Sequence, residues 1–205
     1  MKKFTYFLFA AMFLFLIGTP SGDAAELKDF KENQKISAEK IDARIAEINS
    51  KYDVGEPFSE EDGAFIMKYA MKHAPDETIN PMIIYNKVYS ATNSLSGVSA
   101  TISGTCRIDH LVPFVNSYSC DLYARSNKGT VSAILEHTAY GAIGEKAIGI
   151  VYSRTHTSNA GQQAANLSAG NNYGAFVAWS YTSVKAQAKG ISSLGRLVTV
   201  EAIDS

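Results

Sequence analysis

Histidine has the side chain that most readily exchanges protons near neutral pH, and the spacing of the four histidines in this sequence argues against a metal site. They are His73, His110, His137 and His156. Zinc sites usually include two closely spaced ligands among His, Cys, Asp and Glu, and no such pair of histidines occurs here. We therefore expect no metal ligands. The side chain of His137 shares a strand face with Ala133 and Leu135, so we expect it to be buried or to lie at a strand end.

Carboxylates are scarce in the C-terminal half of the chain, and the pair of most interest is Asp121 and Glu136. A glycosidase would hold two such groups about 5–9.5 Å apart. Their positions in the sequence do not set that distance, so we interpret them as isolated, solvated charges. An extracellular hydrolase is the third-ranked functional hypothesis.

Other signatures of catalysis are missing from the sequence. It contains no Gly-x-Ser-x-Gly motif of the kind that exposes a nucleophilic serine. It also contains no phosphate-binding loop and no dinucleotide fingerprint. We predict no catalytic residue and no cofactor.

The two cysteines, Cys106 and Cys120, are predicted to form one disulfide, because an isolated pair in an exported chain is usually bridged. The flanking pattern supports this bridge. In an antiparallel hairpin with the cysteines opposite each other, every neighbouring pair on that face is apolar, and a slip of one residue would reverse the faces. The predicted partners are Ile102 with Ala124, Gly104 with Leu122, and Ile108 with Tyr118.

Residues 1–25 have the pattern of a secretory signal peptide. A basic start, MKK, precedes an apolar run of about a dozen residues, and small residues surround a predicted cleavage after Ala24 or Ala25. We therefore expect a secreted protein, extracellular or at the cell surface, and the compact start favours a bacterial source. Without these residues, 17 basic and 19 acidic residues remain, a formal net charge of −2. That balance argues against a nucleic acid partner.

The chain changes character near residue 76. Residues 26–76 form a helical N-terminal segment. The stripe Ile41, Ile45, Ile48 and Tyr52 predicts a first helix, and Ser59 followed by acidic residues predicts the start of a second that ends near residue 74. This segment either completes the core or is a removed pro-region, and we favour the first interpretation because apolar stripes need a surface to cover.

Residues 77–205 alternate apolar and polar side chains between turn residues, as strands do. We predict an α+β protein in which the two-helix segment precedes an antiparallel β-sandwich or small barrel of about seven strands, stapled by the disulfide. The expected strands are residues 81–90, 97–110, 118–125, 131–139, 146–154, 174–186 and 194–203.

The segment 155–173 is long, rich in amides and alcohols, and interpreted as a connection that either stays irregular or forms a short helix over 160–169. Aromatic residues follow it, and such side chains can stack on ligands, although burial in the core is the commoner role. The candidate ligand-binding residues are Asn171, Asn172, Tyr173, Trp179 and Tyr181.

These patterns favour a secreted, non-catalytic binding, cell-surface or matrix protein. We expect a partner in the cell envelope or outside the cell, and a membrane is the less favoured partner. The alternative is a secreted membrane-active or bacteriocin-like toxin, because strands that alternate Ser or Thr with apolar residues also occur in membrane pores.

Overall fold

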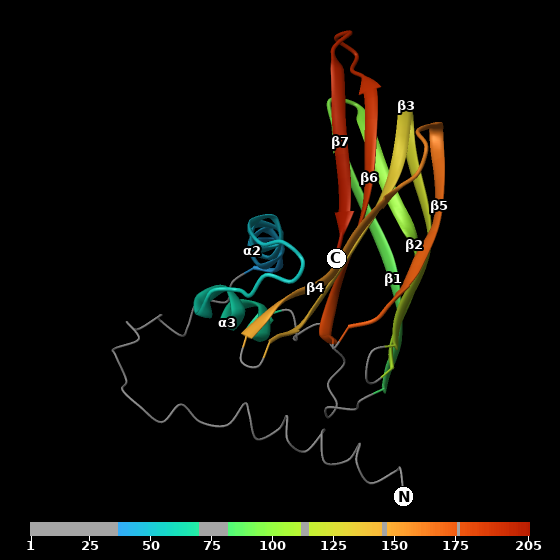
Figure 1. Cartoon of the computed structure of the whole chain (residues 1–205). Helices are drawn as coiled ribbons and strands as arrows, with labels where there is room; N and C mark the ends of the chain where they lie inside the picture. The colour runs from blue at the N-terminus through green and yellow to red at the C-terminus, as the bar shows by residue number, and fades with distance from the viewer. Residues whose placement is uncertain (1–36, 70–81, 112–114, 145–146, 176) are drawn as a thin grey trace, which may run out of the picture. The chain divides into compact units, whose positions relative to one another are not determined.

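The computed structural model describes residues 37–69, 82–111, 115–144, 147–175 and 177–205. Residues Ile41–Ser205 form one compact unit, and only 37–40 of the other unit, Met1–Lys40, are described. The predicted signal peptide, His73 and the proposed end of the second helix near residue 74 therefore lie outside the described residues. The fold is α+β: two short helices precede an antiparallel, nearly closed, barrel-like sheet (Figure 1).

The two helices are α2 (Ala38–Lys51) and α3 (Glu60–Tyr69). The predicted stripe of α2 is its inner face, since Ile45 and Ile48 are fully buried. Helix α3 begins as predicted after Ser59, whose hydroxyl accepts a hydrogen bond from the backbone N–H of Asp62, 3.3 Å away.

Seven strands make up the sheet in the described part of the chain, and every pairing is antiparallel. They are β1 (Met82–Leu95), β2 (Val98–Leu111), β3 (Val115–Ile143), β4 (Ala147–Thr157), β5 (Gly161–Tyr173), β6 (Val177–Ile191) and β7 (Leu197–Asp204).

Strand β3 folds back on itself and so belongs to two layers. Its first part pairs with β2 and β5, and its second part pairs with β4 and β6. Tyr118 and His137 are 19 positions apart, which would separate them by about 60 Å on a straight strand, yet their rings stack 4.1 Å apart. The corner lies near Ser126 and Lys128, where the hydroxyl of Ser126 donates to the backbone carbonyl of Lys128. The layers are therefore β1-β2-β3-β5 and β7-β6-β3-β4.

The predicted pairing of β2 with β3 is confirmed. Cys106 lies opposite Cys120 and the two are bridged. The other predicted pairs also stand opposite each other: Ile102 with Ala124, Gly104 with Leu122, and Ile108 with Tyr118. The face they share is the core face, because alternation at period 2 puts every second side chain between the two layers.

The edges of the two layers meet at two seams that side chains close. On one side, the backbone N–H of Ser90 in β1 donates to Asp204 Oδ2 in β7 at 2.6 Å, and Asn93 Nδ2 donates to the Glu201 carbonyl at 2.9 Å. On the other side, Asn171 Nδ2 in β5 donates to the Tyr152 hydroxyl in β4 at 2.8 Å. These contacts replace backbone ladders at the seams.

The helices cover part of the outer face of the layer that contains β4 and β6 (Figure 1). Ile45, Ile48 and Ile66 share a buried cluster with Tyr140 and Ile150 of the sheet. The link between the helices also pairs with β4, since Phe58 N–H donates to the Ile148 carbonyl at 2.8 Å. The helices and this layer thus share one hydrophobic cluster, separate from the cluster between the two layers.

The predicted connection over 155–173 is wrong, because most of it is strand: β4 runs to Thr157 and β5 starts at Gly161. Alternate residues of β5 do face inward, but several are small, so their apolar signal is weak. The predicted strands 118–125 and 131–139 are one strand, β3. The expected total of about seven strands is therefore right, although two predicted strands are the single strand β3 and the strand β5 was not predicted.

Candidate functional site

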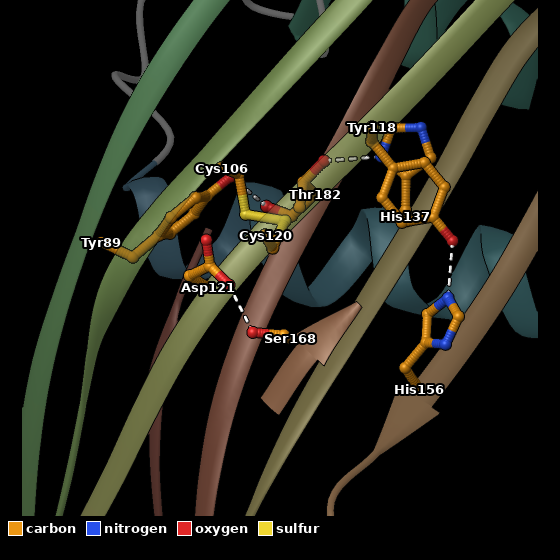
Figure 2. Close-up of a disulfide and its surroundings, with 9 residues drawn as sticks. All are labelled: Tyr89, Cys106, Tyr118, Cys120, Asp121, His137, His156, Ser168 and Thr182. Atoms are coloured by element: carbon orange, nitrogen blue, oxygen red, sulfur yellow. Dashed lines mark hydrogen bonds between the residues drawn. A yellow bond between two sulfur atoms is a disulfide. The ribbon is translucent and has the colours of Figure 1, made fainter. Parts of the chain in front are cut away.

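A cluster of tyrosines and histidines lies between the two layers beside the β4–β5 seam, and its centre is His137 (Figure 2). The imidazole is fully buried. Its Nδ1 is hydrogen-bonded to Thr182 Oγ1 in β6 at 2.7 Å, and its Nε2 to the Tyr173 hydroxyl in β5 at 3.0 Å. Both ring nitrogens are therefore satisfied by neutral groups from two other strands.

Burial determines the charge of this histidine. Desolvation by burial, with a smaller contribution from His110, lowers the pKa of His137 to about 3. Burial raises the pKa of the Tyr173 phenol. The central pair is thus neutral around pH 7, and it stabilises the packing of three strands rather than supplying a charge.

The cluster extends toward solvent through Tyr118. Its hydroxyl is hydrogen-bonded to His156 Nε2 at 2.8 Å (Figure 2). The same hydroxyl is hydrogen-bonded to the Tyr152 hydroxyl at 3.3 Å. Burial raises the pKa of Tyr118, while burial and the Arg154 charge lower the pKa of His156. A neutral histidine and a neutral phenol are the favoured states, so this pair can exchange hydrogen-bond roles without carrying an ion.

The third histidine of the described region, His110, forms a separate polar group near the end of β2. Its Nδ1 is hydrogen-bonded to Asn116 Oδ1 at 3.2 Å, and its Nε2 to Ser180 Oγ at 2.9 Å. Burial lowers the pKa of His110 despite the hydrogen bond with Asn116. This histidine connects β2, β3 and β6 across the interior.

The two carboxylates considered as a catalytic pair point away from each other. Cys120 and Leu122 face the core, so Asp121 between them faces outward on one layer, and Glu136 faces outward on the other. Asp121 accepts a hydrogen bond from the Ser168 hydroxyl in β5 (Figure 2). The structure therefore does not bring these acids to one site.

The five candidate ligand-binding residues lie in different surroundings. Tyr173 and Asn171 belong to the cluster at the β4–β5 seam. The neighbouring Asn172 is exposed on the outer face of β5. Trp179 and Tyr181 pack instead against the cluster under the helices, and the Tyr181 hydroxyl donates to Asp42 Oδ1 at 3.2 Å. No single surface unites the five.

A second region, which sequence reasoning missed, is the end of the sandwich where β6 turns into β7. We call it the turn end and define it by four exposed aliphatic side chains. They are Leu95 (57% exposed), Ile191 (62%), Leu194 (81%) and Leu197 (73%). The prediction missed this region because it placed Leu194 in a strand over 194–203, whereas β7 begins at Leu197. The available signal was the turn-forming run Ser192-Ser193 before Gly195, with large aliphatic residues among and beside it.

The turn between β6 and β7 is held by its own hydrogen bonds. The buried Ser192 hydroxyl accepts from the backbone N–H groups of Leu194 and Arg196, both at 3.3 Å. The Ser192 carbonyl accepts from Gly195 N–H at 2.9 Å, and Gly195 adopts a positive φ of 75° that suits glycine. Leu194 is therefore presented by an ordered turn.

Within the described ranges, no three or more His, Cys, Asp or Glu side chains are grouped so that they could hold a metal ion. None of the helices described has the length and apolar character needed to cross a membrane. No protein-family model, curated protein or solved structure matches the chain.

Proposed function

We propose that the protein is an exported, non-catalytic binding protein that acts in the cell envelope or outside the cell, with the turn end as its contact surface. The observation that carries this proposal is the exposure of four aliphatic side chains at one end of an ordered sandwich. Clusters of exposed apolar residues on otherwise well-packed proteins are typical of interaction sites.

The rest of the architecture suits a rigid scaffold for that surface. The Cys106–Cys120 bridge ties β2 to β3, and neutral hydrogen bonds around His137 tie β3 to β5 and β6. A disulfide is compatible with an oxidising compartment, and the signal-peptide pattern of residues 1–25 agrees with export.

Co-sedimentation of the purified, oxidised protein with washed bacterial cell walls and with lipid vesicles tests the proposal. We expect the wild-type protein to pellet with at least one of them. The double substitution Leu194→Asp and Leu197→Asp should leave it in the supernatant. Val54→Asp is the matched control, because Val54 is also exposed (56%) but lies between the helices. Wild-type protein that stays in solution with both materials would contradict the proposal.

A second candidate is a membrane-active toxin, favoured by the same exposed aliphatic side chains, since apolar residues on a turn can enter a bilayer interface. Release of a dye trapped in vesicles separates the two functions. Binding without release supports a surface-binding protein, and rapid release by wild-type protein that Leu194→Asp abolishes supports a toxin.

A further inference from the structure

We infer that the turn end docks on the surface of an anionic lipid bilayer, with Leu194 entering the interface and nearby cations facing the headgroups. This inference rests on the proposed function and names its partner. It is carried by the exposed aliphatic residues, by the charges beside them, and by the hydrogen bonding of the turn.

The turns at this end of the sandwich contact one another. Asn127, at the corner of β3, accepts a hydrogen bond from Ser99 N–H at 2.8 Å and donates to the Gly97 carbonyl at 3.1 Å. The corner also approaches β6 closely, because a Cβ on Gly129 would lie 2.0 Å from the Lys189 carbonyl oxygen. Figure 1 shows the β1–β2 turn and the β6–β7 turn at the same end of the sheet.

The charges at the turn end have one sign. Lys128, Lys189 and Arg196 are exposed, and in the part of the chain that the structure describes none of them belongs to an ion pair. The segments that make the turns contain no aspartate or glutamate: 94–99, 126–131, 157–163 and 188–199. The turn end is thus basic, although the whole chain has a net charge of −1.

Aliphatic side chains beside cations favour a bilayer over other anionic partners. A soluble or wall-bound polyanion attracts the lysines and the arginine, but it provides no apolar phase for Ile191, Leu194 and Leu197. A bilayer interface accepts both kinds of side chain, and anionic headgroups add attraction for each cation.

The turn also has the hydrogen bonding that a low-polarity environment requires. Backbone N–H groups without partners are costly there, because water no longer satisfies them. In the β6–β7 turn, the N–H groups of Ser192, Leu194, Gly195 and Arg196 already have acceptors inside the turn. Leu194 can therefore enter the interface without exposing these donors to lipid.

Binding to vesicles of phosphatidylcholine with and without phosphatidylglycerol tests this inference, with bacterial cell walls sedimented in parallel. We expect binding to the anionic vesicles that weakens as salt is added. Leu194→Asp should weaken it about tenfold or more, and Lys189→Gln with Arg196→Gln about fivefold per charge removed. Val54→Asp and Lys68→Gln are the matched controls and should bind like wild type.

Several outcomes would overturn the inference. Equal binding to both kinds of vesicle would show that the cations do not contribute to binding. Unchanged binding by Leu194→Asp and by Lys189→Gln with Arg196→Gln would show that the turn end is not the contact surface. A wild-type dimer that Leu194→Asp converts to a monomer, without an effect on vesicle binding, would make the turn end a contact between two copies.

Pelleting with cell walls but with neither kind of vesicle would overturn the bilayer inference and leave the proposed binding function supported. No pelleting with any of them would contradict both. Circular dichroism of each variant confirms that it is folded.

Discussion

The Tyr118 ring stacks on His137 at 4.1 Å although both residues belong to one strand, β3. This contact exists because β3 turns a corner and contributes to both layers. It places a neutral histidine in the middle of the sandwich, where Thr182 and Tyr173 occupy its two nitrogens. The stability of the fold should therefore respond to pH through this residue.

Replacing His137 by asparagine should change the acid sensitivity of the protein. The folded-state pKa of His137, about 3, lies below the value of about 6.5 in the unfolded chain. The unfolded chain therefore binds more protons, and stability is lost as the pH falls from about 6.5 toward 3, by up to about 1.4 kcal/mol per pH unit. Urea unfolding across this range should show a smaller slope for His137→Asn.

The control for this experiment is Thr182→Val, which removes a partner of His137 but not the titrating group. It should lower stability by about 1–3 kcal/mol at neutral pH and keep the acid slope. Equal slopes for wild type and His137→Asn would refute the assignment of this pH dependence to His137.

Removing the disulfide with Cys106→Ala and Cys120→Ala should lower the free energy of unfolding by about 3 kcal/mol, because the bridge closes a loop between two cysteines that are 14 positions apart in the sequence. The pairing of β2 with β3 should survive, since the apolar pairs beside the bridge remain. Denaturant titration with and without a reductant measures the effect. The reductant should destabilise wild type and leave the double variant unchanged.

Asp62 should stabilise the helix pair. It is almost fully buried and pairs with Arg44 at 2.6 Å and Lys51 at 2.7 Å. Burial raises the pKa of Asp62, but hydrogen bonds from Lys51, Tyr52 and Ser59 outweigh that effect and lower it to about 2. Asp62→Ala should therefore cost about 3 kcal/mol near neutral pH, measured by thermal or urea unfolding.

The contribution of Asp62 has its own pH window. Because its folded pKa is lowered from 3.8, the stability it supplies is present above pH 3.8 and is lost as the pH falls toward 2, below most of the range assigned to His137. Glu47→Gln is the control: Glu47 also pairs with Arg44 but its side chain is 62% exposed. It should cost less than about 1 kcal/mol, and an equal cost for both variants would contradict the role of burial.

The β1–β7 seam should open more easily when Asp204 is replaced by alanine. The backbone N–H of Ser90 would lose its acceptor, a bond of about 1 kcal/mol. Hydrogen exchange at Ser90 should accelerate about fivefold to tenfold. Glu201→Gln keeps the carbonyl that accepts from Asn93 and should leave exchange at Ser90 unchanged. If both variants exchange alike, this hydrogen bond does not hold the seam.

Local pattern was sufficient for part of the fold. Alternation at period 2 predicted the facing pairs of β2 and β3, because only one register puts Ile102, Cys106 and Ile108 against apolar partners. The stripe of Ile45 and Ile48 predicted the buried face of α2 for the same reason. Strand β5 escaped prediction because its inward residues include Ala165 and Ala169, whose weak apolar signal resembles that of a polar connection.

The sequence by itself determined which side chains of β2 and β3 face inward, the disulfide partners and the expected burial of His137, because these depend on neighbours within one or two strands. The tertiary structure alone decided the corner in β3, the two partners of His137 and the gathering of aliphatic and basic residues at the turn end. Period-2 alternation is the same whichever layer a strand joins, so it carries no information about contacts between layers. Those contacts depend on how the whole chain packs.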